Sequence, residues 1–211
     1  MNNIDLVIYI NLDKRPDRKE QVLQQLAKFP ELDGKIMRHA AMLHDQPAVG
    51  CSLSHAGALR KAHDAGVECA LILEDDFDFV EPIDMIRNKL NYFFGDIASM
   101  AQWDALLLSR KVSTYERFNE NLVRLTDCSN ASGYIIRRHC MLPLADLAER
   151  GAAALSRTGM HWLYAIDVIW CHLMKRGNWF TFNEPLGYQR VGFSDISGTV
   201  SDNRCLDILP L

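Results

Sequence analysis

The chain has 211 residues, of which 48% are hydrophobic and 24% are charged, and its formal net charge at pH 7 is −4. This length suffices for one sizeable core, and the composition is ordinary for a soluble globular protein. The slight acidic excess argues against a general nucleic-acid binder, which usually carries a basic surface, although it leaves room for a local basic pocket.

Cysteine usage and the amino-terminal residues bear on the cellular compartment. The six cysteines lie in scattered apolar segments and form no Cys-x-x-Cys pair, so we expect free buried thiols rather than a zinc ribbon. Free thiols suit a reducing compartment. The amino-terminal residues lack the pattern of a signal peptide, and no apolar run reaches the ~18–20 residues that span a bilayer. These features predict a cytoplasmic protein.

The first part of the chain alternates between apolar runs and helical patterns. Residues 6–12 are apolar except for Asn11 and rich in β-branched side chains, without an alternation of polar and apolar residues, which predicts a buried strand. A helix is expected over residues 16–29, with a proline in its first turn, and a short strand over residues 35–40. Ser52 or Ser54 is expected to cap a second helix that ends near Gly66.

The remaining elements continue this alternation. We expect buried strands over residues 69–73, 103–108 and 133–136, helices over about 140–150 and 162–175, and a late strand over 179–182. The sequence contains no internal repeat and no clear linker. The pattern predicts an α/β fold over residues 1–211, a single domain with a mostly parallel central sheet flanked by helices.

Three carboxylates follow the buried strand at residues 69–73: Glu74, Asp75 and Asp76, with Asp78 close behind. Open α/β sheets bind ligands at the carboxyl ends of their strands, and crowded carboxylates repel each other unless a positive charge lies between them. Oxygen ligands favour magnesium or manganese over zinc. The segment therefore predicts a divalent metal site; the alternative is a solvated turn whose acids cap the next helix.

Two other segments carry polar residues beside predicted helix starts. Arg15 and Arg18 follow the first strand, where basic groups and a helix N-terminus favour phosphate. Ser54 and His55 are expected in the first turn of the second helix, where His55 would contact a phosphate or a sugar hydroxyl. The alternatives are a charged surface turn in the first segment and a capping or packing role for His55 in the second.

The three segments together resemble a known family. The sequence reads Asn-Leu-x-x-Arg-Pro-Asp-Arg over residues 11–18, Gly-Cys-x-x-Ser-His over 50–55 and Ile-Leu-Glu-Asp-Asp over 72–76. This order resembles glycosyltransferase family 25, which includes bacterial lipooligosaccharide galactosyltransferases and collagen galactosyltransferases. Further similarity extends over nearly the whole chain. The resemblance implies a GT-A type fold, a nucleotide-sugar donor, usually UDP-galactose, and inversion at the anomeric carbon.

Under this resemblance the candidate residues take roles toward a UDP-hexose and a Mn²⁺ or Mg²⁺ ion. Asp76 is the first choice for the metal, and Asp78 is a further ligand or a supporting partner. Glu74 would orient the donor or contact its ribose, and Asp75 would point toward the sugar or into a supporting network. The expected donor contacts are Asn11, Arg15, Arg18, Ser54, His55, Glu74, Asp75 and Gln189.

Inverting transfer also needs a base for the acceptor hydroxyl. Asp167 is the leading candidate, because a charge between apolar neighbours is costly to bury without a role or a partner; a helix cap or an ion pair is the alternative. Asp195, in a glycine-flanked loop, is the second candidate. We expect residues 1–110 to bind the nucleotide and residues 111–211 to bind a glycan or glycolipid acceptor. A lipid-linked acceptor leaves peripheral membrane contact open.

Two other functions remain open at this stage. A metal-dependent phosphoester hydrolase would use the same acidic segment, but such enzymes usually offer more His and Asp ligands for two ions, and no His lies in this segment. A non-catalytic module that binds a nucleotide-sugar or a protein is the other alternative, and the intact acidic motif argues against it.

Overall fold

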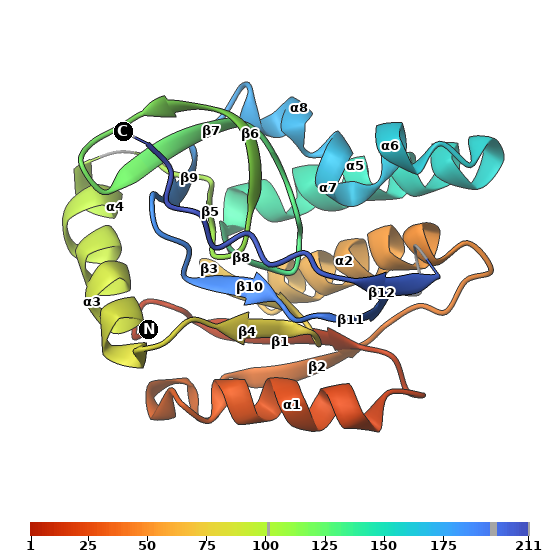
Figure 1. Cartoon of the computed structure of the whole chain (residues 1–211), viewed down its shortest axis with the longest axis horizontal. Coiled ribbons are helices and arrows are strands. Elements are labelled where there is room, and N and C mark those ends of the chain that lie inside the picture. Colours follow the sequence, from red (N-terminus) through yellow and green to blue (C-terminus); the bar gives the residue numbers. More distant parts are fainter. Residues whose placement is uncertain (101, 195–197, 211) are drawn as a thin grey trace.

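A computed structural model describes residues 1–100, 102–194 and 198–210, and it has a large central sheet of eight strands (Figure 1). Six strands share one direction, and β8 and β7 run opposite to them. The predicted α/β fold with a mostly parallel sheet is therefore confirmed. Across the sheet the strands are β2 (Ile36–Ala40), β1 (Leu6–Asn11), β3 (Cys69–Glu74), β8 (Gly133–Arg137), β5 (Ala105–Leu107), β9 (Trp179–Phe182), β7 (Leu122–Ser129) and β6 (Lys111–Arg117).

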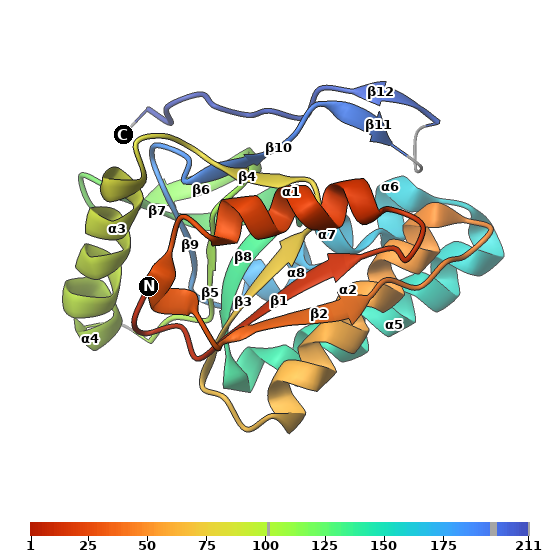
Figure 2. The same cartoon turned by 90° about the horizontal axis from the view of Figure 1, so that it is seen from below.

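Helices cover both faces of this sheet (Figure 2). On β1, Val7 faces a core that includes residues of α1 and α3, whereas Ile8 faces a core built with α2 and α5. Strands buried on both faces need continuous apolar runs, which explains the sequence of β1 and β3. The helical segments are α1 (Pro16–Leu26), η1 (Pro30–Leu32), α2 (Pro47–Asp64), α3 (Ile83–Tyr92), η2 (Phe93–Ile97), α4 (Ala98–Met100), α5 (Arg138–Thr158), α6 (His161–Tyr164), α7 (Ile166–Ile169) and α8 (Cys171–Met174).

Two small antiparallel sheets lie outside the main one: β4 (Phe77–Phe79) pairs with β10 (Gly187–Gln189), and β11 (Gly192–Ser194) pairs with β12 (Thr199–Ser201). The β4–β10 pairing carries the segment of β10 to β12 along one side of the molecule, as Figure 2 shows. It leaves no room for a side chain at residue 187, because a Cβ there would overlap the buried ring of Phe77.

Three local predictions were wrong. Helix α2 begins at Pro47 rather than at Ser52 or Ser54, because proline suits the first helical position. Ser54 and His55 therefore lie inside the helix, about two turns from its start, rather than at its N-terminus. The helix predicted over residues 162–175 is divided into α6, α7 and α8. The β6–β7 hairpin and α3 were not predicted at all.

Two further predictions concern compartment. The six cysteines are free thiols, as expected. Within the described ranges, no helix combines the length and the apolar character that crossing a bilayer requires.

Candidate functional site

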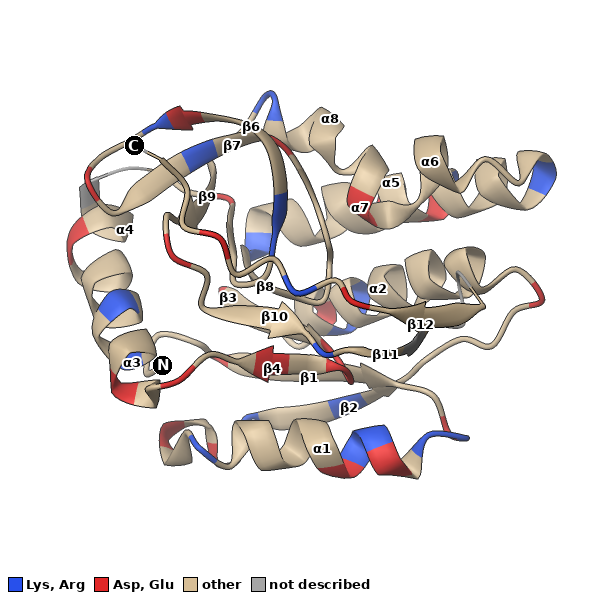
Figure 3. Cartoon of the chain, in the orientation of Figure 1, with Lys and Arg blue, Asp and Glu red and all other residues tan. Residues whose placement is uncertain are grey.

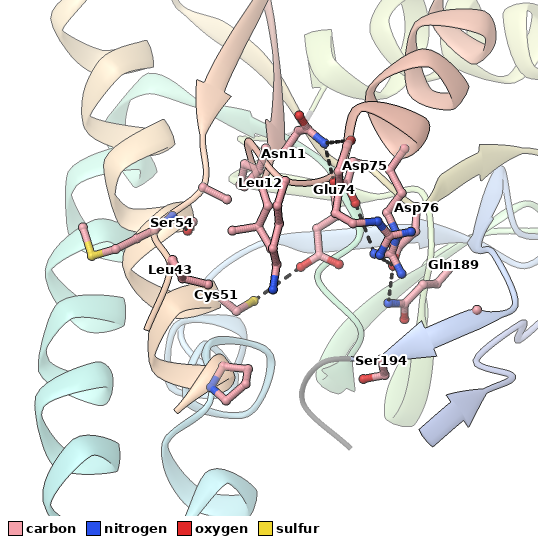
Figure 4. A pocket seen from close by; sticks show the side chains of 18 of the residues that line it. Asn11, Leu12, Leu43, Cys51, Ser54, Glu74, Asp75, Asp76, Gln189 and Ser194 are labelled. Atoms are coloured by element: carbon pink, nitrogen blue, oxygen red, sulfur yellow. Dashed lines mark hydrogen bonds and ion pairs between the residues drawn. The ribbon is translucent and has the colours of Figure 1, made fainter. Parts of the chain in front are cut away.

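A cavity of about 250 Å³ lies at the carboxyl ends of β1 and β3. These neighbouring parallel strands pair Ile10 with Glu74, so the residues that follow each strand reach the same edge of the sheet. Helix α2 supplies another part of the lining, and β10, β11 and β12 supply the rest. Figure 4 shows Asn11, Glu74, Asp76 and Gln189 converging there from three separate parts of the chain.

The acidic segment is held on the cavity wall by hydrogen bonds from two sides. The side chain of Asn11 donates to Asp75 Oδ2 at 2.7 Å. Arg18, on α1, donates from one guanidinium nitrogen to Asp75 at 3.2 Å and to Asp76 at 3.0 Å. Both aspartates are largely buried, and burial raises the pKa of Asp75. Arg18 thus offsets part of the negative charge that β3 brings to the cavity.

Asp76 retains an uncompensated oxygen. Its Oδ2 accepts hydrogen bonds from Arg18 at 3.0 Å and from Gln189 at 3.2 Å. Its Oδ1 is buried and has no hydrogen-bond partner among the described residues. Burial, reinforced by the charge of Glu74, raises the pKa of Asp76 to about 7. A buried carboxylate oxygen in this position is costly unless a cation reaches it.

The donor set fits a divalent cation of the magnesium or manganese type. Asp75 and Asp76 offer carboxylate oxygens on the wall of a cavity, and Oδ1 of Asp76 has the capacity for a ligand bond. Hard oxygen ligands of this kind suit Mg²⁺ and Mn²⁺, which keep waters and take further ligands from phosphates.

Glu74 takes a different direction from its two neighbours and contacts α2. Its Oε1 lies 3.1 Å from Nε2 of His55 and accepts the thiol of Cys51 at 3.4 Å. Although burial opposes ionisation, the hydrogen bond with His55 holds the pKa of Glu74 below its usual value. His55 is fully buried, and its Nδ1 lies 3.0 Å from the hydroxyl of Tyr134. The partnership with Tyr134 was not predicted, because an apolar strand run does not reveal where one hydroxyl points.

Asp78 is not placed as a metal ligand would be. It does not line the cavity, and Arg190 binds both of its carboxylate oxygens, one of them at 2.9 Å. Arg190 does line the cavity, and its backbone N–H donates to the carbonyl oxygen of Asp76 at 2.7 Å. Of the two roles predicted for Asp78, this position suits the supporting partner, because its carboxylate holds Arg190 in place.

Basic residues line the cavity together with the acidic turn, and Figure 3 shows Lys and Arg positions at the start of α1. Arg15 lines the cavity and forms an ion pair with Asp17 at 2.7 Å. Lys14, Arg18 and Arg190 also line it. Several positively charged side chains beside the N-terminus of α1 provide an environment that suits an anion.

Ser54 lines the cavity through α2 but is engaged in local contacts. Its hydroxyl accepts a hydrogen bond from the backbone N–H of Met42 at 2.8 Å and donates one to the carbonyl of Gly50 at 2.6 Å. These contacts fix the loop before α2 against the helix. The structure thus places Ser54 at the cavity, with a hydroxyl already used by the protein.

Asp167 lies near the site but does not line the cavity. Its Oδ2 accepts the backbone N–H of Asn130 at 3.1 Å. Burial raises the pKa of Asp167, and the charge of Glu74 raises it further. Asp195, the other candidate base, lies outside the described residues.

No family model matches the chain. Over 164 residues the chain is 25% identical to procollagen galactosyltransferase 1 of Danio rerio, an alignment that covers 63% of this chain and 27% of that protein. The chain thus spans about a quarter of the length of this relative. The similarity makes the chain a remote relative of a sugar-transferring enzyme.

Solved structures with a similar chain trace include a glycosyltransferase involved in the glycosylation of the major capsid of PBCV-1. Its TM-score is 0.47 at 8% identity, over 84% of this chain and 91% of that one. An apo UDP-glucose pyrophosphorylase has a TM-score of 0.47 at 9% identity, over 87% of this chain and 76% of that one.

Proposed function

We propose that this chain is a metal-dependent glycosyltransferase of family 25 with a GT-A type fold. It transfers a hexose, galactose in our proposal, from a UDP-sugar to a hydroxyl of a glycan acceptor such as lipooligosaccharide, with inversion. The observation that carries the proposal is Asp76, which lines a cavity together with several Lys and Arg side chains and whose buried Oδ1 lacks a hydrogen-bond partner among the described residues. The motifs and the galactosyltransferase relative support the same reaction.

In this proposal, different residues around the cavity bind the metal ion and the diphosphate of the donor. Asp76, with Asp75 beside it, would hold Mn²⁺ or Mg²⁺, and the bound ion would offset the charge of the departing diphosphate. Arg15 and Arg18 bind the diphosphate oxygens, since guanidinium groups match phosphate geometry. Asn11 holds Asp75 in place through its 2.7 Å hydrogen bond.

Four further cavity residues complete the proposed donor site. Gln189 contacts Asp76 and the diphosphate side of the donor. Ser54 and His55 form the wall on the α2 side, and Glu74, held by His55, orients the ribose or the sugar. The amino-terminal part to about residue 110 therefore supplies most of the nucleotide site, and we assign acceptor binding to residues 111–211.

The acceptor hydroxyl must lose a proton as it attacks the anomeric carbon. We propose Asp167 as the base, with Asp195 as the alternative. The raised pKa of Asp167 brings a carboxylate closer to the working pH, which is the condition for efficient proton transfer. A lipid-linked acceptor would place the enzyme in the cytoplasm at the inner face of a membrane.

The test combines donor binding with turnover. UDP-galactose, UDP-glucose and UDP are each added to the protein with and without Mn²⁺, and the melting temperature and the slow release of UDP are measured. We expect a metal-dependent shift with UDP and release from UDP-galactose. Asp76→Ala should lose both, whereas the control Asp84→Asn, an exposed carboxylate on α3 that does not line the cavity, should keep them.

Each other outcome rejects part of the proposal. If UDP with metal does not shift the melting temperature and no donor releases UDP, the protein is a non-catalytic binding module. Release of inorganic phosphate from simple phosphate esters would identify a hydrolase. Normal Mn²⁺-dependent UDP affinity in Asp76→Ala would remove Asp76 from the metal site.

A further inference from the structure

We propose that Cys51, His55 and Glu74 form a second metal site, one that takes Zn²⁺, beside the oxygen-only site at Asp76. Cys51 and His55 are four residues apart on α2, so both side chains project from the same face of the helix. The end of β3 brings the carboxylate of Glu74 to them. Two ligands at this helical spacing, with a third from another element, are a common way to build a zinc site.

The distances suit an ion without a large rearrangement. One ligand atom from each residue lies within 4.8 Å of the others. The Oε1 of Glu74 is 3.4 Å from Sγ of Cys51 and 3.1 Å from Nε2 of His55. In a tetrahedral zinc site with bonds of about 2.0–2.3 Å, neighbouring ligand atoms are about 3.3–3.8 Å apart. Two of the three separations are therefore already near those of such a tetrahedron, and the third, between Cys51 and His55, is at most 4.8 Å.

A supporting contact orients the imidazole. The other ring nitrogen of His55, Nδ1, lies 3.0 Å from the hydroxyl of Tyr134, which both donates and accepts and so supports either tautomer. Tyr134 is itself buried and packs edge to face on Trp170. A second partner of this kind is what fixes histidine ligands in metal sites. Nε2 is thereby directed at Glu74, which also contacts Cys51.

The cavity gives the site access and a fourth position. Cys51, His55 and Glu74 all line it, so an ion can enter and a water or a ligand oxygen can complete the coordination (Figure 4). Sulfur, nitrogen and oxygen together favour Zn²⁺, whereas the all-oxygen site at Asp76 favours Mg²⁺ or Mn²⁺. The two sites therefore differ in which ion they select although they share one cavity.

Cobalt tests the proposal, because Co²⁺ replaces Zn²⁺ and a bound thiolate gives it a charge-transfer absorption. Reduced, metal-free protein is titrated with Co²⁺, and then Zn²⁺ is added to displace it. We expect the absorption to appear and then to disappear at one equivalent of Zn²⁺. Cys51→Ser should abolish it and weaken Zn²⁺ binding by at least about 10-fold, since even changes outside the ligand set cost 10–100-fold.

Cys140→Ser is the matched control, because Cys140 belongs to another cluster with Asp104 and His139. It should leave the absorption intact. Glu74→Gln removes the charge of another proposed ligand and should also weaken Zn²⁺ binding. Circular dichroism of each variant confirms that the fold is retained.

Three results would overturn the proposal. The first is no thiolate absorption with Co²⁺ in the unmodified protein. The second is an absorption that survives in Cys51→Ser and is lost in Cys140→Ser, which would assign the ion to the other cluster. The third is its loss in Asp76→Asn, which would mean that there is one shared site. None of these measurements requires sugar transfer, so they stand or fall independently of the proposed function.

Discussion

Replacing Asp76 with asparagine should stabilise the metal-free protein while removing its metal site. The change keeps the shape of the side chain and deletes its charge. In the folded protein one oxygen accepts from Arg18 and Gln189, and the other is buried with no partner among the described residues. Keeping this carboxylate ionised therefore lowers the stability of the folded, metal-free protein, and a neutral amide does not carry this charge.

The size of this effect follows from the pKa of Asp76, which burial raises from 3.8 to about 7. At about 1.4 kcal/mol per pKa unit, keeping the ionised form in the folded, metal-free protein costs on the order of 4 kcal/mol. The asparagine amide nitrogen would be left without a partner at a cost of about 1–3 kcal/mol. The net gain at pH 8 is about 1–3 kcal/mol, or roughly 2–12 °C in melting temperature for a domain of this size.

The direction of the pH dependence is fixed by the raised pKa. Below about pH 4, Asp76 is protonated in both the folded and the unfolded wild type. Between about pH 4 and pH 7, the unfolded state has released the proton and the folded state has not, so wild-type stability falls as pH rises. The stability difference should therefore move in favour of the variant by on the order of 4 kcal/mol across this window, and then stay constant.

The assay is thermal unfolding at pH 4 and pH 8, with a chelator and with Mn²⁺. Manganese at about 100 times its dissociation constant should stabilise the wild type by about 2.7 kcal/mol and leave Asp76→Asn unchanged. Asp78→Asn is the control, because it breaks the ion pair with Arg190 and should lower the melting temperature with or without metal. With chelator, the melting temperature of Asp76→Asn relative to the wild type should be higher at pH 8 than at pH 4. If this difference is the same at both pH values, the burial of Asp76 does not raise its pKa as described.

Three further predictions use other residues. Asp167→Asn should keep Mn²⁺-dependent UDP binding but lose about 10²–10⁴-fold in transfer rate, measured by UDP release with acceptor; full activity would move the base to Asp195. Arg18→Ala should weaken UDP binding about 10–100-fold by calorimetry at saturating Mn²⁺, because a hydrogen bond to a charged group contributes about 1.5–3 kcal/mol; unchanged affinity would exclude a phosphate contact. Gly187→Ala should lower stability by about 1–3 kcal/mol in urea unfolding, because the new methyl group overlaps Phe77, and an unchanged midpoint would contradict that packing.

Much of the fold was predictable because its signals are local. The run at residues 69–73 is continuously apolar and the run at residues 6–12 is apolar except for Asn11, and these runs form β3 and β1. Glu74, Asp75 and Asp76 are adjacent in sequence, so their position at the end of a buried strand followed directly. The contact of Asn11 with Asp75 was not predicted, because it depends on the pairing of β1 with β3.

The errors arose where pairing over a long sequence distance decides the structure. Strand β6 is largely exposed and polar, so it gave no apolar pattern, and only its pairing with β7 makes it a strand. The neighbouring position of Gln189 and Asp76 depends on β10 pairing with β4, which no local signal reveals. Helix α2 begins earlier than predicted because Pro47 occupies its first position, whereas Ser52 and Ser54, which are typical capping residues, lie inside the helix.

The cavity is walled by two kinds of structure. Its floor, at the ends of β1 and β3, is continuous with the buried core, whereas the segment of β10 to β12 belongs to separate small sheets. Gly187 of β10 packs on the buried Phe77, but the described residues of β11 and β12 lie outside the buried core, so replacements there disturb few core contacts while they change the lining of the cavity. If the proposed function holds, replacements in β11 and β12 would therefore change the contacts to the donor without altering the strand ends that hold the carboxylates.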